Sequence, residues 1–164
     1  MKGQKRKEIH KLYPNFHLLV IDDNSPDGTG EIIQSLCQTI PNLKLIKRHN
    51  KLGLGTAHQL AMQYALHNNY DRLVTMDADL SHMPSDIGRL INELDNADFV
   101  IGSRYMPGGS CDYSGYRKIV SIFANISARL LLGIPLHEVT TSFRAFRVPI
   151  LKKLPYSKMQ TPGY

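Results

Sequence analysis

The chain contains no apolar run long enough to cross a bilayer and no segment typical of a secretory signal. A membrane-spanning helix needs about 18 or more consecutive apolar residues, and none of the apolar stretches reaches that length. The N-terminus, MKGQKRKEIHK, is charged and lacks the apolar core of a signal peptide. These absences predict a soluble or peripheral protein with no transmembrane segment.

Cysteines and metal-binding histidine patterns are also scarce. Cys37 and Cys111 are the only cysteines, which does not suggest a disulfide framework and makes a reducing compartment the expectation. The seven histidines form neither an H-E-x-x-H motif nor a Cys/His spacing, so no zinc site is expected.

The composition is that of one ordinary globular domain. Hydrophobic residues make up 42% and charged residues 21% of the 164 residues, which argues against disorder. The net charge of +6 suits a phosphate-bearing ligand or an anionic membrane surface. The basic N-terminal run inflates this charge, so no nucleic-acid partner is expected.

Short apolar strands alternate with helical patterns over the first hundred residues. The patterns predict strands at 17–21, 42–48, 72–76 and 98–103, and helices at 29–40, at 54–68 and from Pro84 onward. This alternation predicts an α/β fold with parallel strands joined by helical crossovers. After residue 103 it gives way to a glycine-rich loop and an amphipathic helix over 116–132.

Polar residues follow three of the predicted strands where each strand ends: Asp22–Asp23, Asp77 with Asp79, and Ser103–Arg104. Ligands of open α/β sheets bind outside the carboxyl ends of the strands, so these residues are candidates for one site. Residues two apart on an extended backbone point to the same side, so both carboxylates of the D-x-D pair can face one ligand. Mg²⁺ binds one or two carboxylates together with substrate phosphates. The pattern favours a metal site, although turn and helix-cap roles are the alternative.

Weaker signals each leave two interpretations open. The GLGT stretch (53–56) can cradle a phosphate or form a tight strand-to-helix turn. His82 can bind metal or sit at a helix entry, and the helix over 116–132 can pack on the sheet or rest on a membrane. We expect the Asp22 carboxylate to accept hydrogen bonds from turn amides and the Asp23 carboxylate to contact the ligand. The opposite assignment of the two roles is the alternative.

Five motifs carry a resemblance to a known family. VIDDNSPDGT, LGLGTA, MDADLSH, IGSRY and TSFRAFR stand in the order and spacing of family 2 glycosyltransferases with the GT-A fold. Among them the chain resembles the dolichol-phosphate (polyprenol-phosphate) mannosyltransferases over residues 15–155. The resemblance implies a mostly parallel, Rossmann-like sheet flanked by helices, in a single domain over residues 1–164.

The resemblance implies that mannose moves from GDP-mannose to a dolichyl (polyprenyl) phosphate, with inversion and with Mg²⁺ or Mn²⁺. On the donor side it implies nucleoside contacts from Ile21 and Asp23, and metal and sugar-nucleotide binding by Asp77, Ala78 and Asp79. Toward the phosphates and the acceptor it implies roles for Arg104, Arg117, Lys118, Ser142 and Arg144. Asp79, Arg104 and Arg117 would be the catalytic residues.

A phosphate acceptor fits the absence of an evident general base. The second pKa of a phosphate monoester is about 6, so its oxygen is largely ionised at neutral pH without help from a side chain. A sugar hydroxyl would need a base more strongly. The family further implies peripheral contact with the cytoplasmic side of the endoplasmic reticulum or of a bacterial inner membrane, and allows a membrane-anchoring partner subunit.

Both ends of the chain depart from the family pattern. Relatives begin with a strand carrying Pro-x-Tyr-Asn-Glu and continue beyond TPGY through a helix and a basic segment. We therefore expect a domain cut at both ends, with a central strand missing and its neighbours' edges exposed. Glu138 also stands where relatives often carry Asp. Two other functions remain open: a non-catalytic fragment or pseudo-enzyme that binds a nucleotide sugar or partner chain, and transfer of glucose or another sugar to undecaprenyl phosphate or a glycan hydroxyl.

Overall fold

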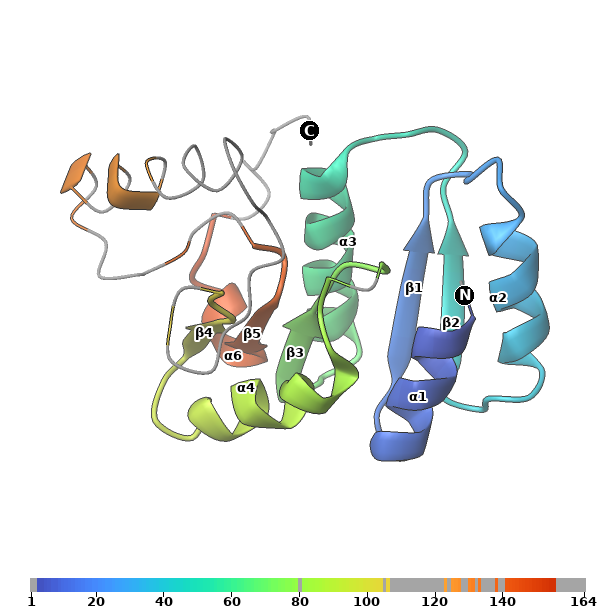
Figure 1. Cartoon of the computed structure of the whole chain (residues 1–164), viewed down its shortest axis with the longest axis horizontal. Coiled ribbons are helices and arrows are strands. Elements are labelled where there is room, and N and C mark those ends of the chain that lie inside the picture. The colour runs from blue at the N-terminus through green and yellow to red at the C-terminus, as the bar shows by residue number, and fades with distance from the viewer. Residues whose placement is uncertain are drawn as a thin grey trace.

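The computed structural model describes residues 3–79, 81–104 and 141–155, together with 106, 123, 125–127, 130–131, 133 and 138. Two sheets and the helices around them make up this part of the chain (Figure 1). The elements are α1 (Gln4–Leu12), β1 (Leu18–Asp22), α2 (Thr29–Cys37), β2 (Leu43–Lys47), α3 (Leu54–His67), β3 (Arg72–Thr75), the 3-10 turn η1 (Pro84–Asp86), α4 (Ile87–Glu93), β4 (Phe99–Ile101), β5 (Arg144–Arg147) and α6 (Val148–Leu151). Every strand and helix predicted before residue 104 is present, although the helix predicted over 29–40 ends at Cys37.

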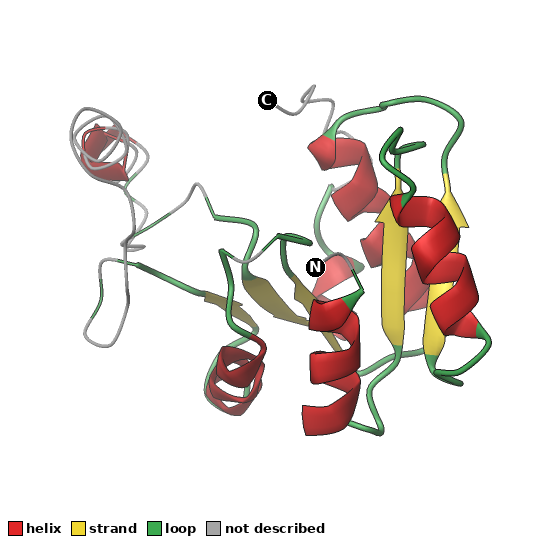
Figure 2. Cartoon of the chain, turned by 45° about the vertical axis from the view of Figure 1, so that its right-hand side comes forward, coloured by secondary structure: helices red, strands yellow, loops and turns green. Residues whose placement is uncertain are grey.

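The first sheet consists of β1 and β2, which are parallel and in register from Leu18 opposite Leu43. Their connection is the helical crossover α2, as predicted, and α2 lies against the two strands (Figure 2). Ile33 and Leu36 of α2 are buried in one cluster with Leu43. Gly30 permits this close packing, because a Cβ there would lie 2.7 Å from the Lys47 side chain and 3.0 Å from the Asp22 carboxylate.

The second sheet has the order β3-β5-β4, with β5 antiparallel to both neighbours. The strands β3 and β4 therefore run parallel to each other, as the crossover pattern predicts. The sequence did not predict the antiparallel strand between them. The strand β5 spans only four residues, and its central Ala145 and Phe146 are both buried between arginines. So short a segment shows too little alternation of apolar and polar residues to be identified as a strand from the sequence.

The strands β1 and β3 are not paired in the described part of the chain, and a cavity of about 840 Å³ lies beside them. Consecutive residues of both strands line it, Leu18–Ile21 and Leu73–Met76. Successive side chains of a strand point to opposite faces of its sheet. When consecutive residues line a cavity, the backbone edge of the strand therefore faces it. Ala57 and Ala61, on the predicted apolar face of α3, line it as well. Among the described residues, one edge of β1 and one edge of β3 thus face this cavity without a neighbouring strand.

These open edges predict a pattern of hydrogen exchange. We expect fast exchange for the amides of β1 and β3 that face the cavity, because no neighbouring strand holds them. The amides of β5, which lies between two strands, should all exchange slowly. Native-state exchange followed by NMR measures both sets. Uniform protection of the three strands would contradict the open edges.

One hydrophobic cluster connects the two sheets and positions α1. Ile9 of α1 is buried with Leu90 of α4 and Ala145 of β5, and Leu18 of β1 packs against the same cluster. The Tyr13 hydroxyl, just after α1, accepts a hydrogen bond from the Gly88 amide at 3.0 Å. These contacts bring the first turn of α1 to the carboxyl end of β3.

Candidate active site

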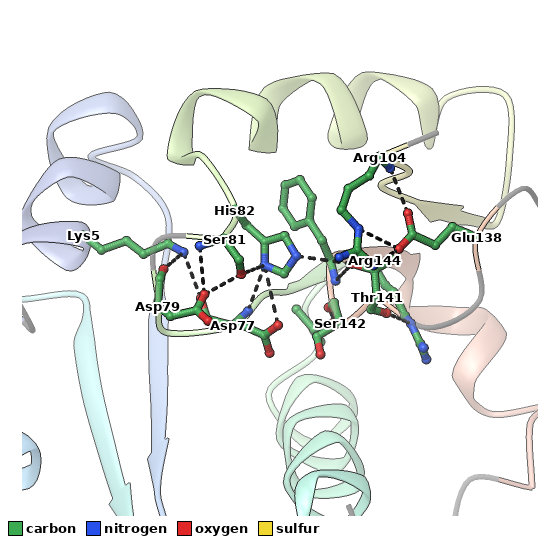
Figure 3. A network of polar contacts seen from close by, with 12 residues as sticks. Lys5, Asp77, Asp79, Ser81, His82, Arg104, Glu138, Thr141, Ser142 and Arg144 are labelled. Carbon is green, nitrogen blue, oxygen red and sulfur yellow. Dashed lines mark hydrogen bonds and ion pairs between the residues drawn. The ribbon is translucent and has the colours of Figure 1, made fainter. Parts of the chain in front are cut away.

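Asp77 and Asp79 follow β3 on a loop that a lysine from α1 supports (Figure 3). The Lys5 ammonium donates to the backbone carbonyl of Asp77 at 2.9 Å and also to that of Asp79. Lys5 is only 4% exposed, so it belongs to the structure of the loop. Sequence reasoning missed this residue, because Lys5 is 72 positions from Asp77 in the chain and only the packing of α1 brings the two together.

The Asp79 carboxylate is held by its own turn. One oxygen accepts the Ser81 amide at 2.9 Å and the Ser81 hydroxyl. Partial burial raises the pKa of Asp79, but the Ser81 hydrogen bonds and the Lys5 charge outweigh it and lower the pKa below its usual value. Asp79 is therefore an anion at neutral pH.

Asp77 and Asp79 offer hard carboxylate oxygens, the kind of donor that a divalent cation such as Mg²⁺ binds together with phosphate oxygens. The hydrogen bonds of Lys5 go to backbone carbonyls, and one Asp79 oxygen carries the Ser81 bonds. The Asp77 side chain is 38% exposed and has His82 Nδ1 at 3.8 Å from one oxygen. Within the described ranges no group of three or more His, Cys, Asp or Glu side chains could hold a metal ion. Two carboxylates completed by substrate phosphates are the arrangement typical of Mg²⁺.

His82 lies two residues before η1, and its ring stacks on Phe143 with centroids 5.0 Å apart. Its ring nitrogens contact the Asp77 amide and the Thr141 hydroxyl. Burial lowers the pKa of His82 below its usual value, although the nearby Asp77 carboxylate acts in the opposite direction. The ring thus connects the D-x-D loop to the segment before β5.

The segment Thr141–Arg144 lies beside the end of β3. The Thr75 hydroxyl donates to the Ser142 carbonyl at 2.8 Å, and Arg144 Nε donates to the Thr141 carbonyl at 2.7 Å. The Asp77 carboxylate is near enough to Arg144 to raise the pKa of the guanidinium, although burial lowers it more. Ser142 and Arg144 are therefore brought next to the D-x-D loop, and their roles toward sugar and acceptor stay a prediction.

Asp22 and Asp23 have different partners, and the contact of Asp22 with a turn amide is the one that the sequence predicts, while a ligand role of Asp23 stays a prediction. Asp22 is buried and accepts the Ser25 amide of the following turn at 3.4 Å. The Asp23 carboxylate pairs with Arg48, which also donates to the Thr56 hydroxyl at 2.6 Å and to the Gly53 carbonyl at 3.3 Å. Gly53 has a φ of +88°, which favours the tight-turn interpretation of GLGT. Arg48 is a further residue that sequence reasoning missed.

Arg104 is paired with a buried carboxylate. Its backbone amide and Nε donate to the two Glu138 oxygens at 2.8 Å each, and Nη2 also contacts Glu138. Glu138 is fully buried and the Arg104 side chain is 26% exposed. A role for Arg104 toward phosphates stays a prediction.

The other predicted site residues are Ala78, within the D-x-D motif, Ile21, and two residues that the structure does not describe. Ile21 lies in β1 and lines the cavity, where Ala78 also contributes. Arg117 and Lys118 lie outside the described residues, as does most of the helix predicted over 116–132. Among the described helices, none is long and apolar enough to span a bilayer.

Parallel strands with flanking helices, and an acidic pair after a strand end, are consistent with the GT-A fold of glycosyltransferases. Residues 5–155 match the model of glycosyl transferase family 2, and the chain belongs to this family.

Two curated relatives are similar over most of the chain. A polyprenol monophosphomannose synthase of Mycolicibacterium smegmatis is 40% identical over 159 residues, which cover 95% of this chain and 60% of the relative. An undecaprenyl-phosphate mannosyltransferase of Micrococcus luteus is 37% identical over 157 residues, which cover 95% of this chain and 65% of the relative. The chain thus spans less than two thirds of the length of each relative.

Proposed function

We propose that the protein transfers mannose from GDP-mannose to a polyprenyl phosphate, with inversion and with the aid of Mg²⁺ or Mn²⁺. The observation that carries this proposal is the D-x-D loop beside Ser142 and Arg144. Support comes from the two relatives, which are named for joining mannose to a polyprenyl phosphate.

On the donor side, Asp77 and Asp79 would hold the cation, which supplies electrostatic stabilisation of the leaving diphosphate when bound. Asp79 is already ionised, and Ser81 and Lys5 keep its loop in place. Ala78 lies between the two carboxylates and would contact the sugar nucleotide. Ile21 and Asp23 remain our candidates for the nucleoside, with Arg48 fixing the Asp23 carboxylate.

On the acceptor side, the nucleophile would be a phosphate oxygen that is ionised at neutral pH, since its pKa is about 6. The chain then needs cations to bind the acceptor rather than a base to activate it. Arg144 is near Asp77, and Ser142 lies in the same segment. Arg104, Arg117 and Lys118 complete the proposed basic set. In this proposal, charge placement by the chain provides the catalysis.

Contact with a membrane is part of the proposal, because the acceptor is a lipid. The helix predicted over 116–132 can either pack on the sheet or rest on a membrane. Its apolar residues Phe123, Ile126 and Leu130 are 71%, 50% and 79% exposed, which argues against packing at these positions. We propose that they touch the lipid surface on the cytoplasmic side of a membrane. A membrane-anchoring partner subunit is compatible with this arrangement.

Replacing Leu130 with aspartate should weaken binding to vesicles of phosphatidylcholine and phosphatidylglycerol by about tenfold or more, since burying a leucine contributes about 1.5–3 kcal/mol. Sedimentation with the vesicles measures the bound fraction. Ile32→Asp is the matched control, because Ile32 is similarly apolar and 43% exposed but lies on α2. Equal losses for both variants would contradict a membrane face at Leu130.

The donor is tested by calorimetry with Mn²⁺, titrating GDP-mannose and, for comparison, UDP-glucose. We expect GDP-mannose to bind more tightly and to release mannose to a short-chain polyprenyl phosphate. Equal, weak heats for both donors would overturn the mannosyl assignment. Tight binding of GDP-mannose without turnover would favour the non-catalytic alternative, and preference for UDP-glucose would favour transfer of glucose.

A further inference from the structure

The two ring nitrogens of His82 contact different segments of the chain. Nδ1 lies 3.3 Å from the Asp77 amide nitrogen, and Nε2 lies 3.2 Å from the Thr141 hydroxyl (Figure 3). An amide N–H can only donate, so Nδ1 is the acceptor and carries no proton. The proton of the neutral ring is then on Nε2, which donates to Thr141. One tautomer thus satisfies both contacts.

Packing fixes this ring in place. The side chain of His82 is 11% exposed, and its ring lies 21° from parallel to the Phe143 ring. The Thr141 hydroxyl also accepts the Phe143 amide at 3.1 Å, so the oxygen that His82 contacts is itself held by the backbone. A ring stacked on one side and hydrogen-bonded at both nitrogens has one orientation.

The aspartates need such support because they lie beyond the sheet. The strand β3 ends at Thr75, so no strand pairing positions Asp77 or Asp79. The contact of His82 with the Asp77 amide closes the loop on itself, and the contact with Thr141 ties it to the segment that carries Ser142 and Arg144.

We propose that His82 is a positioning residue, which fixes the Asp77 backbone and thereby places the D-x-D carboxylates relative to the Thr141–Arg144 segment. The expected effect of His82 on donor binding rests on the proposed function. The contacts of His82 with Asp77 and Thr141 do not depend on that function. His82 would contact neither sugar nor phosphate. It acts through Asp77, as outer-shell partners of metal ligands do.

The link is tested without any ligand. In ¹⁵N NMR of the whole chain, we expect the His82 ring to carry its proton on Nε2, and the Asp77 amide to be protected from exchange. Thr141→Val, which is isosteric, should expose the Asp77 amide, whereas Thr141→Ser should keep it protected. A proton on Nδ1, or unchanged protection in Thr141→Val, would overturn the link.

The positioning role is tested by a double-mutant cycle with Mn²⁺-dependent GDP binding as the readout. His82→Asn should weaken this binding by about 10–100-fold, the range typical of outer-shell partners. In an Asp77→Ala background the same change should have little further effect. The control is His67→Asn, since His67 is exposed at the end of α3, and it should bind like the unaltered chain. Multiplying losses in the double variant would show a merely structural role and overturn the proposal.

The two proposals fail in different ways. If the unaltered chain binds no GDP with Mn²⁺, the proposed function fails, while the NMR tautomer and the Asp77 exchange still decide the His82 link. If GDP and Mn²⁺ bind normally and His82→Asn changes nothing, the positioning role fails and the proposed function stands.

Discussion

Replacing Asp79 with asparagine should lower the rate of mannosyl transfer by about 10²–10³-fold, the loss typical when one charge-stabilising group is removed. Asparagine keeps an oxygen that can accept the Ser81 bonds, so the turn after β3 should survive. What disappears is the negative charge that would hold the cation against the diphosphate. We therefore expect the loss mainly in kcat/KM at limiting metal.

The assay follows transfer of labelled mannose from GDP-mannose to a short-chain polyprenyl phosphate, with thermal unfolding measured on the same samples. Asp86→Asn is the matched control, because Asp86 is a half-buried aspartate in the neighbouring η1 turn. Full activity in the Asp79 variant, with the fold intact, would remove this carboxylate from the mechanism.

The buried pair of Arg104 and Glu138 should give the largest effect on stability. Removing one partner of a buried ion pair costs about 3–5 kcal/mol, because the other charge is left without its partner. The two changes should differ. Glu138 is fully buried, whereas the Arg104 side chain is 26% exposed and keeps some contact with water. Arg104→Ala should therefore destabilise the chain more than Glu138→Gln.

Urea denaturation of both variants measures these free energies of unfolding. The exposed pair of Arg72 and Asp95 provides the comparison, since its side chains are 42% and 64% exposed. Asp95→Asn should cost less than about 1 kcal/mol, as exposed pairs usually do. If Arg104→Ala costs no more than Asp95→Asn, the buried pair does not stabilise this region of the fold.

Local patterns in the sequence sufficed to predict β1 to β4, the helices α2, α3 and α4, and the acidic strand end, but not α1. The strands are short apolar runs, and Asp77 and Asp79 interrupt one of them abruptly. The helix face of α3 also followed from periodicity, although the structure shows that Ala57 and Ala61 line a cavity. Such signals are local and need no knowledge of the three-dimensional arrangement.

Residues that act across long distances in the chain were not predictable in this way. Lys5 reaches the D-x-D loop only because α1 packs beside η1, and Arg48 reaches Asp23 only because β1 and β2 pair. The position of His82 after the D-x-D pair is a local signal, but its partner Thr141 is 59 positions away in the chain. The strand β5 was missed because its pairing with β3 and β4, rather than its own four residues, makes it a strand.

The proposed activity requires Asp77 and Asp79 to hold one divalent cation together with a diphosphate. Electron paramagnetic resonance of Mn²⁺, with and without GDP, tests this directly. We predict that the unaltered chain binds Mn²⁺ tightly only when GDP is present, and that a chain carrying Asp77→Asn and Asp79→Asn does not. Equal binding of Mn²⁺ by both chains in the presence of GDP would contradict a metal-binding role for Asp77 and Asp79.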